Sequence, residues 1–188
     1  MHRLFIALRP PAAMRETLFE LQDDVEAARW QDDEQLHITL RYVGEVERPV
    51  AEDIAIGLQG VRAAAFDLAL SGVGQFDAGR RGRALWAGVT PHGPVAALHR
   101  KIDQVLIRLG LPPEGRAFLP HITLARLNRS SGPTERFLAA HAGLTSPPMR
   151  FDHFTLYESH LGHAGAWYEA VARYPLDPPP ASDGAAVP

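Results

Sequence analysis

The sequence contains no cysteine. Disulfide-stabilised folds, thiolate zinc sites, iron–sulfur clusters and cysteine nucleophiles are therefore excluded. No stretch approaches the ~20 consecutive apolar residues that a membrane-spanning helix requires, so we expect no membrane partner. Arg9 and the two prolines after it interrupt the N-terminal segment too soon for a signal peptide, and we expect a cytoplasmic protein.

Lysine is almost absent as well. Lys101 is the only lysine, and the other 18 basic residues are arginines. This leaves little scope for Schiff-base chemistry or a phosphate-loop lysine, whereas guanidinium groups, which suit phosphate, are plentiful. The net charge of −3 argues against a protein that holds long duplex nucleic acid by bulk electrostatics, but not against an enzyme that acts on one nucleotide end.

The pattern of apolar residues predicts a mixture of hairpins and helices. Apolar residues at every second position are typical of strands, and a stripe such as that from Val95 to Leu109 is typical of a helix. We expect strands over residues 4–8, 36–43, 66–70 (ending in a glycine-rich turn at 71–74), 84–90, 121–126, 151–158 and 166–174, and helices over 10–29, 49–64, 94–109 and 134–141. This order predicts an α+β fold with antiparallel sheets in one domain over residues 1–174, followed by a disordered Pro/Ala-rich tail over 175–188.

The tetrapeptide His-Ile-Thr-Leu occurs twice, at residues 37–40 and 121–124. Strand alternation places the histidine and the threonine of each copy on one face, with the isoleucine and the leucine on the core face. The simplest alternative is a pair of ordinary sheet positions with partly exposed histidines. Identity of all four residues, once in each half of the chain, favours a functional pair over that alternative.

Two such strands would bring acid–base chemistry to one cleft. Histidine has a pKa near ~6.5, so one imidazole can be neutral while the other is protonated, as concerted general base and general acid catalysis requires. The threonine hydroxyls offer hydrogen bonds to an anionic oxygen. Together with a nearby arginine, this equipment suits attack on a phosphodiester without a metal ion or other cofactor.

The segments Leu36–Val46 and Pro120–Arg126 resemble the paired motifs of the 2H phosphoesterases. The most similar branch is the RNA 2′,3′-cyclic phosphodiesterases, historically called 2′-5′ RNA ligases, and the resemblance extends over residues 3–174. It implies a two-lobed, pseudo-symmetric fold with both motifs in a central cleft. It also implies hydrolysis of a terminal 2′,3′-cyclic phosphate on RNA to a 2′-phosphate without metal or ATP. We expect a monomer, and nothing in the sequence implies a protein partner.

The resemblance also implies a role for each motif residue. His37 maps to the proton donor for the leaving 3′ oxygen, and His121 maps to the proton acceptor that activates water. Exchanged roles would leave no trace in the sequence. The phosphate-binding positions of the family map to Thr39, Thr123 and Arg126.

Several residues near the motifs remain open to two interpretations. Strict alternation points Arg126 away from His121, so the strand must bulge or end by Ala125, or the long side chain must reach around. Tyr42 and Phe118 could stack on a terminal base, although alternation favours the core for Tyr42. We expect Trp86 and Trp167 in the core, and the roles of Arg80, Arg81, Arg83 and of the loop with His160 and His163 stay open between substrate contact and a solvated turn.

Two other functions remain as alternatives. One is a phosphodiesterase that acts on small cyclic nucleotides or on 2′-5′ linked nucleotides. The other is a module that binds RNA ends without turning them over, which the presence of both histidines and both threonines disfavours. Ligation of RNA through a 2′-5′ linkage would be the reverse reaction in the same site.

Overall fold

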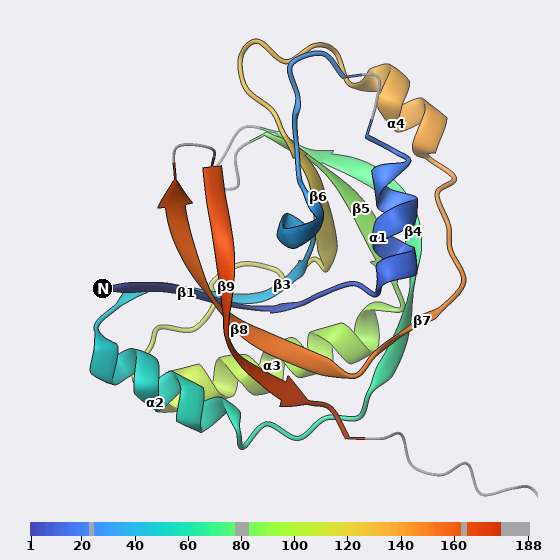
Figure 1. The fold of residues 1–188 in the computed structure, drawn as a ribbon. Coiled ribbons are helices and arrows are strands. Elements are labelled where there is room, and N and C mark those ends of the chain that lie inside the picture. The colour runs from blue at the N-terminus through green and yellow to red at the C-terminus, as the bar shows by residue number, and fades with distance from the viewer. Residues whose placement is uncertain (23–24, 78–82, 163–164, 178–188) are drawn as a thin grey trace, which may run out of the picture.

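The computed structural model describes residues 1–22, 25–77, 83–162 and 165–177 (Figure 1). Its strands are β1 (His2–Leu8), β2 (Arg29–Trp30), β3 (Ile38–Val46), β4 (Phe66–Phe76), β5 (Ala84–Thr90), β6 (His121–Arg126), β7 (Met149–Phe151), β8 (His153–Gly162) and β9 (Gly165–Pro175). The helices are α1 (Ala12–Phe19), α2 (Arg48–Leu58), α3 (His92–Arg108), α4 (Glu135–His141) and the short 3₁₀ helix η1 (Asp33–Gln35). The predicted α+β class with antiparallel pairing is confirmed.

The strands form one curled sheet in the order β7-β4-β5-β6-β3-β1-β8-β9, with β2 paired to β6. The two motif strands, β3 and β6, therefore lie side by side at its centre. β1 flanks β3 on one side as β5 flanks β6 on the other. Ile38 of β3 and Ile122 of β6, the isoleucines of the two tetrapeptides, are register partners. The strand order is therefore similar on the two sides of the central pair, with β5 and β4 following β6 as β1 and β8 follow β3.

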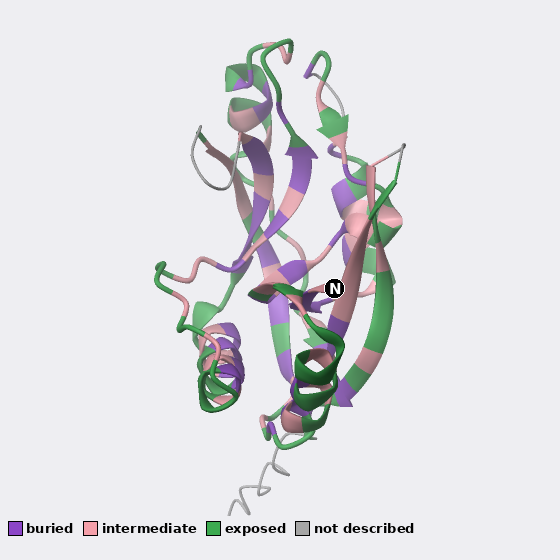
Figure 2. Cartoon of the chain, turned by 90° about the vertical axis from the view of Figure 1, so that its left-hand side faces the viewer, coloured by how far each residue is buried: buried purple, intermediate pink, exposed green. Residues whose placement is uncertain are grey.

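The core side of the sheet is covered by helices. On α3, Val95, Leu98, Ile102 and Leu106 recur every three or four residues and are buried, which is the spacing of one helix face. Gly110, with φ +88°, follows the end of this helix. Figure 2 shows buried residues along the central strands and exposed residues on the outer surfaces of the helices at the lower end. No helix in the described ranges is long and apolar enough to cross a membrane.

Both motif strands contain an irregularity at the leucine of the tetrapeptide. In the pairing of β1 with β3, the register passes from Thr39 to Arg41 and omits Leu40. In the pairing of β5 with β6, it passes from Thr123 to Ala125 and omits Leu124. A bulge reverses the parity of the residues that follow it. The two strands thus change face at equivalent places.

This change of face determines where Tyr42 and Arg126 point. Arg41 is 7% exposed and Tyr42 is 42% exposed, so the core position that alternation predicts for Tyr42 is wrong. On β6, Ala125 turns to the core and Arg126 turns to the face of His121. The bulge, not a long reach of the guanidinium, therefore resolves the position of Arg126.

The predicted helix over residues 10–29 is too long. α1 ends at Phe19, and the chain turns back so that Arg29 and Trp30 pair with β6. The side chain of Gln22 donates a 2.8 Å hydrogen bond to the carbonyl of Gln31 and closes this return. Pairing with a distant strand has overridden the local helical pattern. The helix predicted over 49–64 likewise ends at Leu58.

Two predicted ends are also displaced. β4 continues through the glycine-rich segment to Phe76, because Gly72 adopts φ +70° at a register shift and lets the strand resume. At the C-terminal end, the packed part of the chain continues past Pro175. Leu176 is 6% exposed, and the backbone of Asp177 bonds to Ala63 and Ala65. Residues 178–188 lie outside the described part of the chain.

Candidate active site

A cavity of about 430 Å³ opens between the two central strands. Thr39 of β3 and His37, the residue just before that strand, line it together with His121, Thr123 and Arg126 of β6. All five predicted site residues therefore meet in one place. The meeting follows from the adjacency of β3 and β6 and from the bulge that turns Arg126 inward.

The two histidines have the same local geometry. Nδ1 of His37 lies 2.7 Å from the carbonyl oxygen of Gln35, and Nδ1 of His121 lies 2.7 Å from that of Leu119. In both cases the carbonyl belongs to the residue two positions earlier. A carbonyl can only accept, so Nδ1 carries the proton in each neutral ring. Nε2 of each ring is then the nitrogen that can exchange a proton with a bound substrate.

Aromatic side chains hold both imidazoles in place. The ring of His37 contacts Phe5 at 5.0 Å between centroids and Tyr168 at 5.4 Å, edge to face. The ring of His121 contacts Phe76 at 4.8 Å and Trp86 at 6.2 Å. Such contacts limit rotation of each ring and preserve the direction of Nε2.

Burial lowers the pKa of His37 to about 4. The positive charges of His121 and Arg126 act in the same direction, and the hydrogen bond to Gln35 opposes them. His37 is therefore neutral at pH 7 in the free protein. An anion bound in the cavity would favour its protonated form, because an opposite charge nearby stabilises the imidazolium.

The carbonyl that orients His37 belongs to η1, which is braced from its own N-terminus. Asp32 caps this helix by accepting a 3.0 Å hydrogen bond from the backbone N–H of Gln35. The Gln35 side chain accepts a 3.2 Å bond from the N–H of Asp32 and donates a 2.7 Å bond to the carbonyl of Ala166 on β9. The Asp32-x-x-Gln35 spacing is a capping-box pattern, a signal that our sequence analysis missed.

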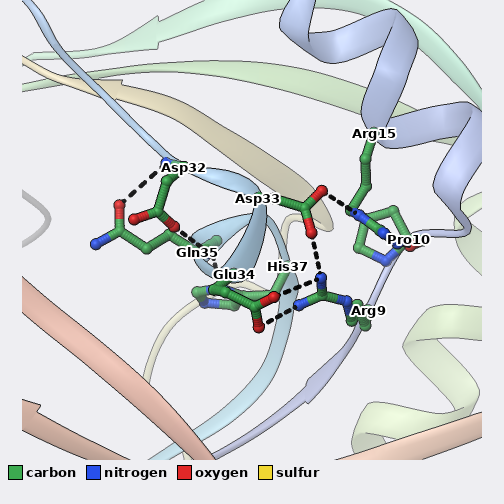
Figure 3. A network of polar contacts seen from close by, with 8 residues as sticks. All are labelled: Arg9, Pro10, Arg15, Asp32, Asp33, Glu34, Gln35 and His37. Carbon is green, nitrogen blue, oxygen red and sulfur yellow. Dashed lines mark hydrogen bonds and ion pairs between the residues drawn. The ribbon is translucent and has the colours of Figure 1, made fainter.

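A charged network connects η1 with α1 and with Arg9, the residue that follows β1 (Figure 3). Asp33 accepts a 2.5 Å bond from Arg9 and a 2.7 Å bond from Arg15. These bonds lower the pKa of the Asp33 carboxyl, chiefly through the hydrogen bond with Arg15. Figure 3 shows His37 directly behind this network, so the network fixes the segment from which the imidazole extends.

Arg41 holds the loop after Pro112, which lines part of the cavity. It donates 2.7 Å bonds to the carboxylate of Asp103 and to the carbonyl of Tyr42, and a 2.5 Å bond to the carbonyl of Pro112. These contacts anchor the loop that brings Glu114, Arg116 and Phe118 to the cavity. The ring of Phe118 stacks on His99 at 4.2 Å.

The cavity is strongly cationic. Tyr42, exposed by the bulge, lines it and accepts a 2.8 Å bond from Arg3. Among the described residues, Glu114 is the one carboxylate of the lining, against Arg3, Arg116, Arg126 and Arg41, and the carboxylate of Asp103 balances the charge of Arg41. This balance favours an anionic ligand.

The other residues singled out in the sequence lie elsewhere. Trp167 is 53% exposed, so its predicted core position is wrong, and it stacks on His160 at 4.0 Å. Arg83 donates to the carbonyl of Asn128, whereas Arg80, Arg81 and His163 lie outside the described residues. Within those ranges, no group of three or more His, Asp or Glu side chains is placed to hold a metal ion.

Comparison with known families gives one match over most of the chain. The sequence model of the family described as the 2′-5′ RNA ligase superfamily matches residues 9–163. A relative from Aeropyrum pernix, named RNA 2′,3′-cyclic phosphodiesterase, is 39% identical over 51% of this chain and 55% of its own length. A relative of the same name from Geobacillus stearothermophilus is 28% identical over 92% of this chain. This chain spans just over half the length of both relatives, 55% and 56%.

Other similar proteins align over nearly their whole length. The RNA 2′,3′-cyclic phosphodiesterase of Escherichia coli is 29% identical over 93% of this chain and 96% of its own length. The crystal structure of E. coli LigT in apo form superposes with a TM-score of 0.76 at 27% identity, over 94% of this chain and 98% of that one. A structure of E. coli LigT complexed with 3′-AMP gives a TM-score of 0.75 at 27% identity, over 93% of this chain and 98% of that one.

Proposed function

The chain belongs to the 2′-5′ RNA ligase superfamily, and we propose that it hydrolyses the 2′,3′-cyclic phosphate at the end of an RNA to a 2′-phosphate. The observation that carries this proposal is the cationic cavity in which two histidines, each with Nδ1 bonded to a carbonyl, present Nε2 beside two threonines and Arg126. The names of the relatives from A. pernix and E. coli support the same substrate.

The proposed reaction is an in-line displacement at phosphorus. Nε2 of His121 accepts a proton from a water molecule as the water oxygen attacks the phosphorus atom. The bond from phosphorus to the 3′ oxygen breaks, and Nε2 of His37 donates its proton to that oxygen. The product has a 2′-phosphate and a 3′ hydroxyl, and a proton returns from His121 to His37 through solvent before the next turnover.

The remaining site residues stabilise the charge on the phosphate. The hydroxyls of Thr39 and Thr123 donate to its non-bridging oxygens, and the guanidinium of Arg126 balances the negative charge that grows in the transition state. His37 must be protonated to act as the donor, although its pKa is about 4 in the free protein. The bound phosphodiester anion supplies the opposite charge that raises it. Exchange of the two histidine roles would give the same products.

The same site would accommodate ligation of two RNAs. If the 5′ hydroxyl of a second RNA replaces water as the nucleophile, the cyclic phosphate opens to a 2′-5′ linkage by the same two proton transfers. One copy of the chain is enough for either reaction, because both motifs come from one chain. We expect the reaction to take place in the cytoplasm on RNA ends left by cleavage.

The test uses purified protein in EDTA with a short RNA that ends in a 2′,3′-cyclic phosphate. The position of the product phosphate is determined with enzymes that remove only 2′ or only 3′ phosphates. A 2′-phosphate that forms in EDTA and is lost in His37→Ala supports the proposal. Binding of the RNA without any product would favour the binding module, and neither binding nor turnover would direct the search to small cyclic nucleotides.

A further inference from the structure

Two arginines face each other at the rim of the cavity. Arg29 of β2 and Arg126 of β6 are register partners in an antiparallel pair, and both side chains are exposed. Directly opposite residues of such a pair share a face, with Cβ atoms about 4.5–5.5 Å apart, and like charges in this arrangement repel. The next pair, Trp30 with Ala125, turns to the core, where Trp30 packs on Phe137 at 5.7 Å. The packing of β2 therefore holds Arg29 beside Arg126 in spite of the repulsion.

No described residue compensates the charge of Arg29. Within the described ranges, no hydrogen bond or ion pair engages its guanidinium, and it does not belong to the cavity lining. The guanidinium lies against Gly165, the first residue of β9. A Cβ atom built on this glycine would be 3.0 Å from Nη1 of Arg29. The carboxylate of Asp32 is engaged by the backbone N–H of Gln35. Arg29 is therefore a cation at the rim with no partner in the described part of the chain, and it lies one strand away from Arg126.

Arg29 also lies close to the catalytic side of β9. The hydroxyl of Tyr168 has a pKa raised by burial, and the charges of Arg126 and Arg29 both oppose that shift. The ring of Tyr168 in turn packs on His37. The charges of Arg126, which lines the cavity, and of Arg29, which does not, therefore both act on a side chain that contacts His37.

We propose that Arg29 binds the phosphodiester that precedes the terminal nucleotide of the RNA, next to the cyclic phosphate at Arg126. This inference rests on the proposed function and narrows its substrate class to oligonucleotides. Two neighbouring cations, one inside the cavity and one at its rim, match two successive phosphates of a single strand. The second phosphate also removes the repulsion between the two arginines. A mononucleoside 2′,3′-cyclic phosphate has no group for Arg29.

The experiment compares two substrates, an RNA oligonucleotide ending in a 2′,3′-cyclic phosphate and a mononucleoside 2′,3′-cyclic phosphate. For Arg29→Ala we expect kcat/KM on the oligonucleotide to fall at least about tenfold, mainly through KM, because the contact forms equally in the ground and transition states. Turnover of the mononucleotide should not change. The slope of log(1/KM) against log salt concentration for the oligonucleotide should lose about 0.7, the value for one phosphate contact on a single strand.

Arg173→Ala is the matched control. Arg173 is another exposed arginine without a hydrogen bond or ion pair among the described residues, eight positions further along β9 than Gly165, which is about 26 Å in an extended strand. We expect no effect of this change on either substrate. Arg29→Lys should recover part of the oligonucleotide activity, because it restores the charge without the planar fork.

Two results would overturn the proposal: equal losses of activity on both substrates, which would place Arg29 at the terminal phosphate, or no loss on either. If the wild-type protein hydrolyses neither substrate, the proposed function fails, and the subsite is then tested by binding. Fluorescence anisotropy with a labelled oligonucleotide that ends in a 2′-phosphate should still show weaker binding by Arg29→Ala. Equal binding by the two proteins would reject the subsite.

Discussion

Ile38 and Ile122 face each other across the centre of the sheet, and both are fully buried. Each is flanked by a histidine and a threonine that turn to the opposite face. Because the two strands run antiparallel, this register brings the histidine of each motif toward the threonine of the other. The candidate site is therefore composite: neither half of the chain contains a histidine with its opposing hydroxyl. A single pair of core residues sets the relative position of all four groups.

We expect His37→Ala and His121→Ala each to remove most turnover and to leave the fold intact. Both rings line the cavity, and neither belongs to the buried core. Loss of a general acid or base typically slows a reaction by about 10²–10⁴-fold. Steady-state kinetics on the cyclic-phosphate RNA measures the loss, and circular dichroism monitors folding. Near-wild-type rates in either variant would rule out the paired mechanism.

The threonines should contribute less than the histidines. Thr39→Ala and Thr123→Ala each delete one hydrogen bond to an anionic oxygen, worth about 1.5–3 kcal/mol, so kcat/KM should fall about 10- to 100-fold. The double variant provides the control for cooperation between the two hydroxyls. If both hold the same phosphate, the two losses should not add, because groups with a shared partner couple. A threonine variant that is as inactive as the histidine variants would contradict this ranking.

We expect the pKa of His37 to rise when an anionic ligand binds in the cavity. Its pKa of about 4 in the free protein means that its NMR resonances should stay those of a neutral ring down to about that pH. Inorganic phosphate or a 2′-phosphorylated product should raise this pKa, because an anion in the cavity favours imidazolium. A free-protein pKa near the unperturbed ~6.5 would contradict the structure.

The same pKa predicts a trend in stability. Between about pH 6.5 and pH 4 the unfolded chain binds a proton at His37 that the folded protein does not, so the free energy of unfolding falls as the pH is lowered through this window. His37→Ala should show a shallower decline over the same range. Urea denaturation at several pH values measures both slopes. Equal slopes would mean that His37 is not desolvated in the folded protein.

Local sequence patterns were enough for the motif strands but not for the residues just beyond them. The alternation in His-Ile-Thr-Leu has a period of two, and the structure keeps it within each tetrapeptide. The bulges at Leu40 and Leu124 depend on how β1 and β5 pair with the motif strands, which no local pattern contains. Tyr42 was therefore predicted on the wrong face, and Arg126 could not be placed.

Long-range contacts account for the other differences. The end of α1 depends on the pairing of Trp30 with a strand almost a hundred residues away. The support of His37 by Asp33 requires Arg9 and Arg15 to arrive from separate elements, so only the capping box of η1 was open to detection in the sequence. The exposure of Trp167 likewise depends on which face of β9 is covered.

Asp33 should affect catalysis through the position of His37. Asp33→Asn removes the charge that holds Arg9 and Arg15, loosens η1 and lets the Gln35 carbonyl move. We expect kcat to fall about tenfold with little change in KM, since small displacements of a catalytic group are costly while binding groups stay in place. The neighbouring Glu34→Gln is the control, because Glu34 also contacts Arg9 but its side chain is 75% exposed.

A purely structural role for Asp33 would lower the melting temperature without moving the His37 resonances. We expect the opposite balance, with a changed NMR titration of the His37 ring in Asp33→Asn and an unchanged one in Glu34→Gln. Asp33→Glu, which keeps the charge, should recover part of the lost kcat. A wild-type kcat for Asp33→Asn would remove Asp33 from the mechanism.

The buried pair of Arg41 and Asp103 should be the most sensitive ion pair for stability. The Arg41 side chain is 8% exposed and that of Asp103 is 17% exposed, with 2.7 Å between Nε and Oδ1. Asp103→Ala leaves a desolvated guanidinium without its main partner, and breaking such a pair costs about 3–5 kcal/mol. The carbonyls of Tyr42 and Pro112 still accept from Arg41, which places the expected loss at the lower end, about 3 kcal/mol.

The pair of Arg48 and Glu52 provides the comparison for that loss. Its distance is also short, 2.8 Å, but the side chains are 80% and 59% exposed on one turn of α2. Such pairs contribute about 0.3–0.5 kcal/mol, so Glu52→Ala should scarcely change the midpoint of urea denaturation. Similar losses of unfolding free energy in Asp103→Ala and Glu52→Ala would show that the Arg41 guanidinium becomes hydrated when its partner is removed. The loop with Glu114, Arg116 and Phe118 would then be free to move, and the cavity would lose that wall together with the ion pair.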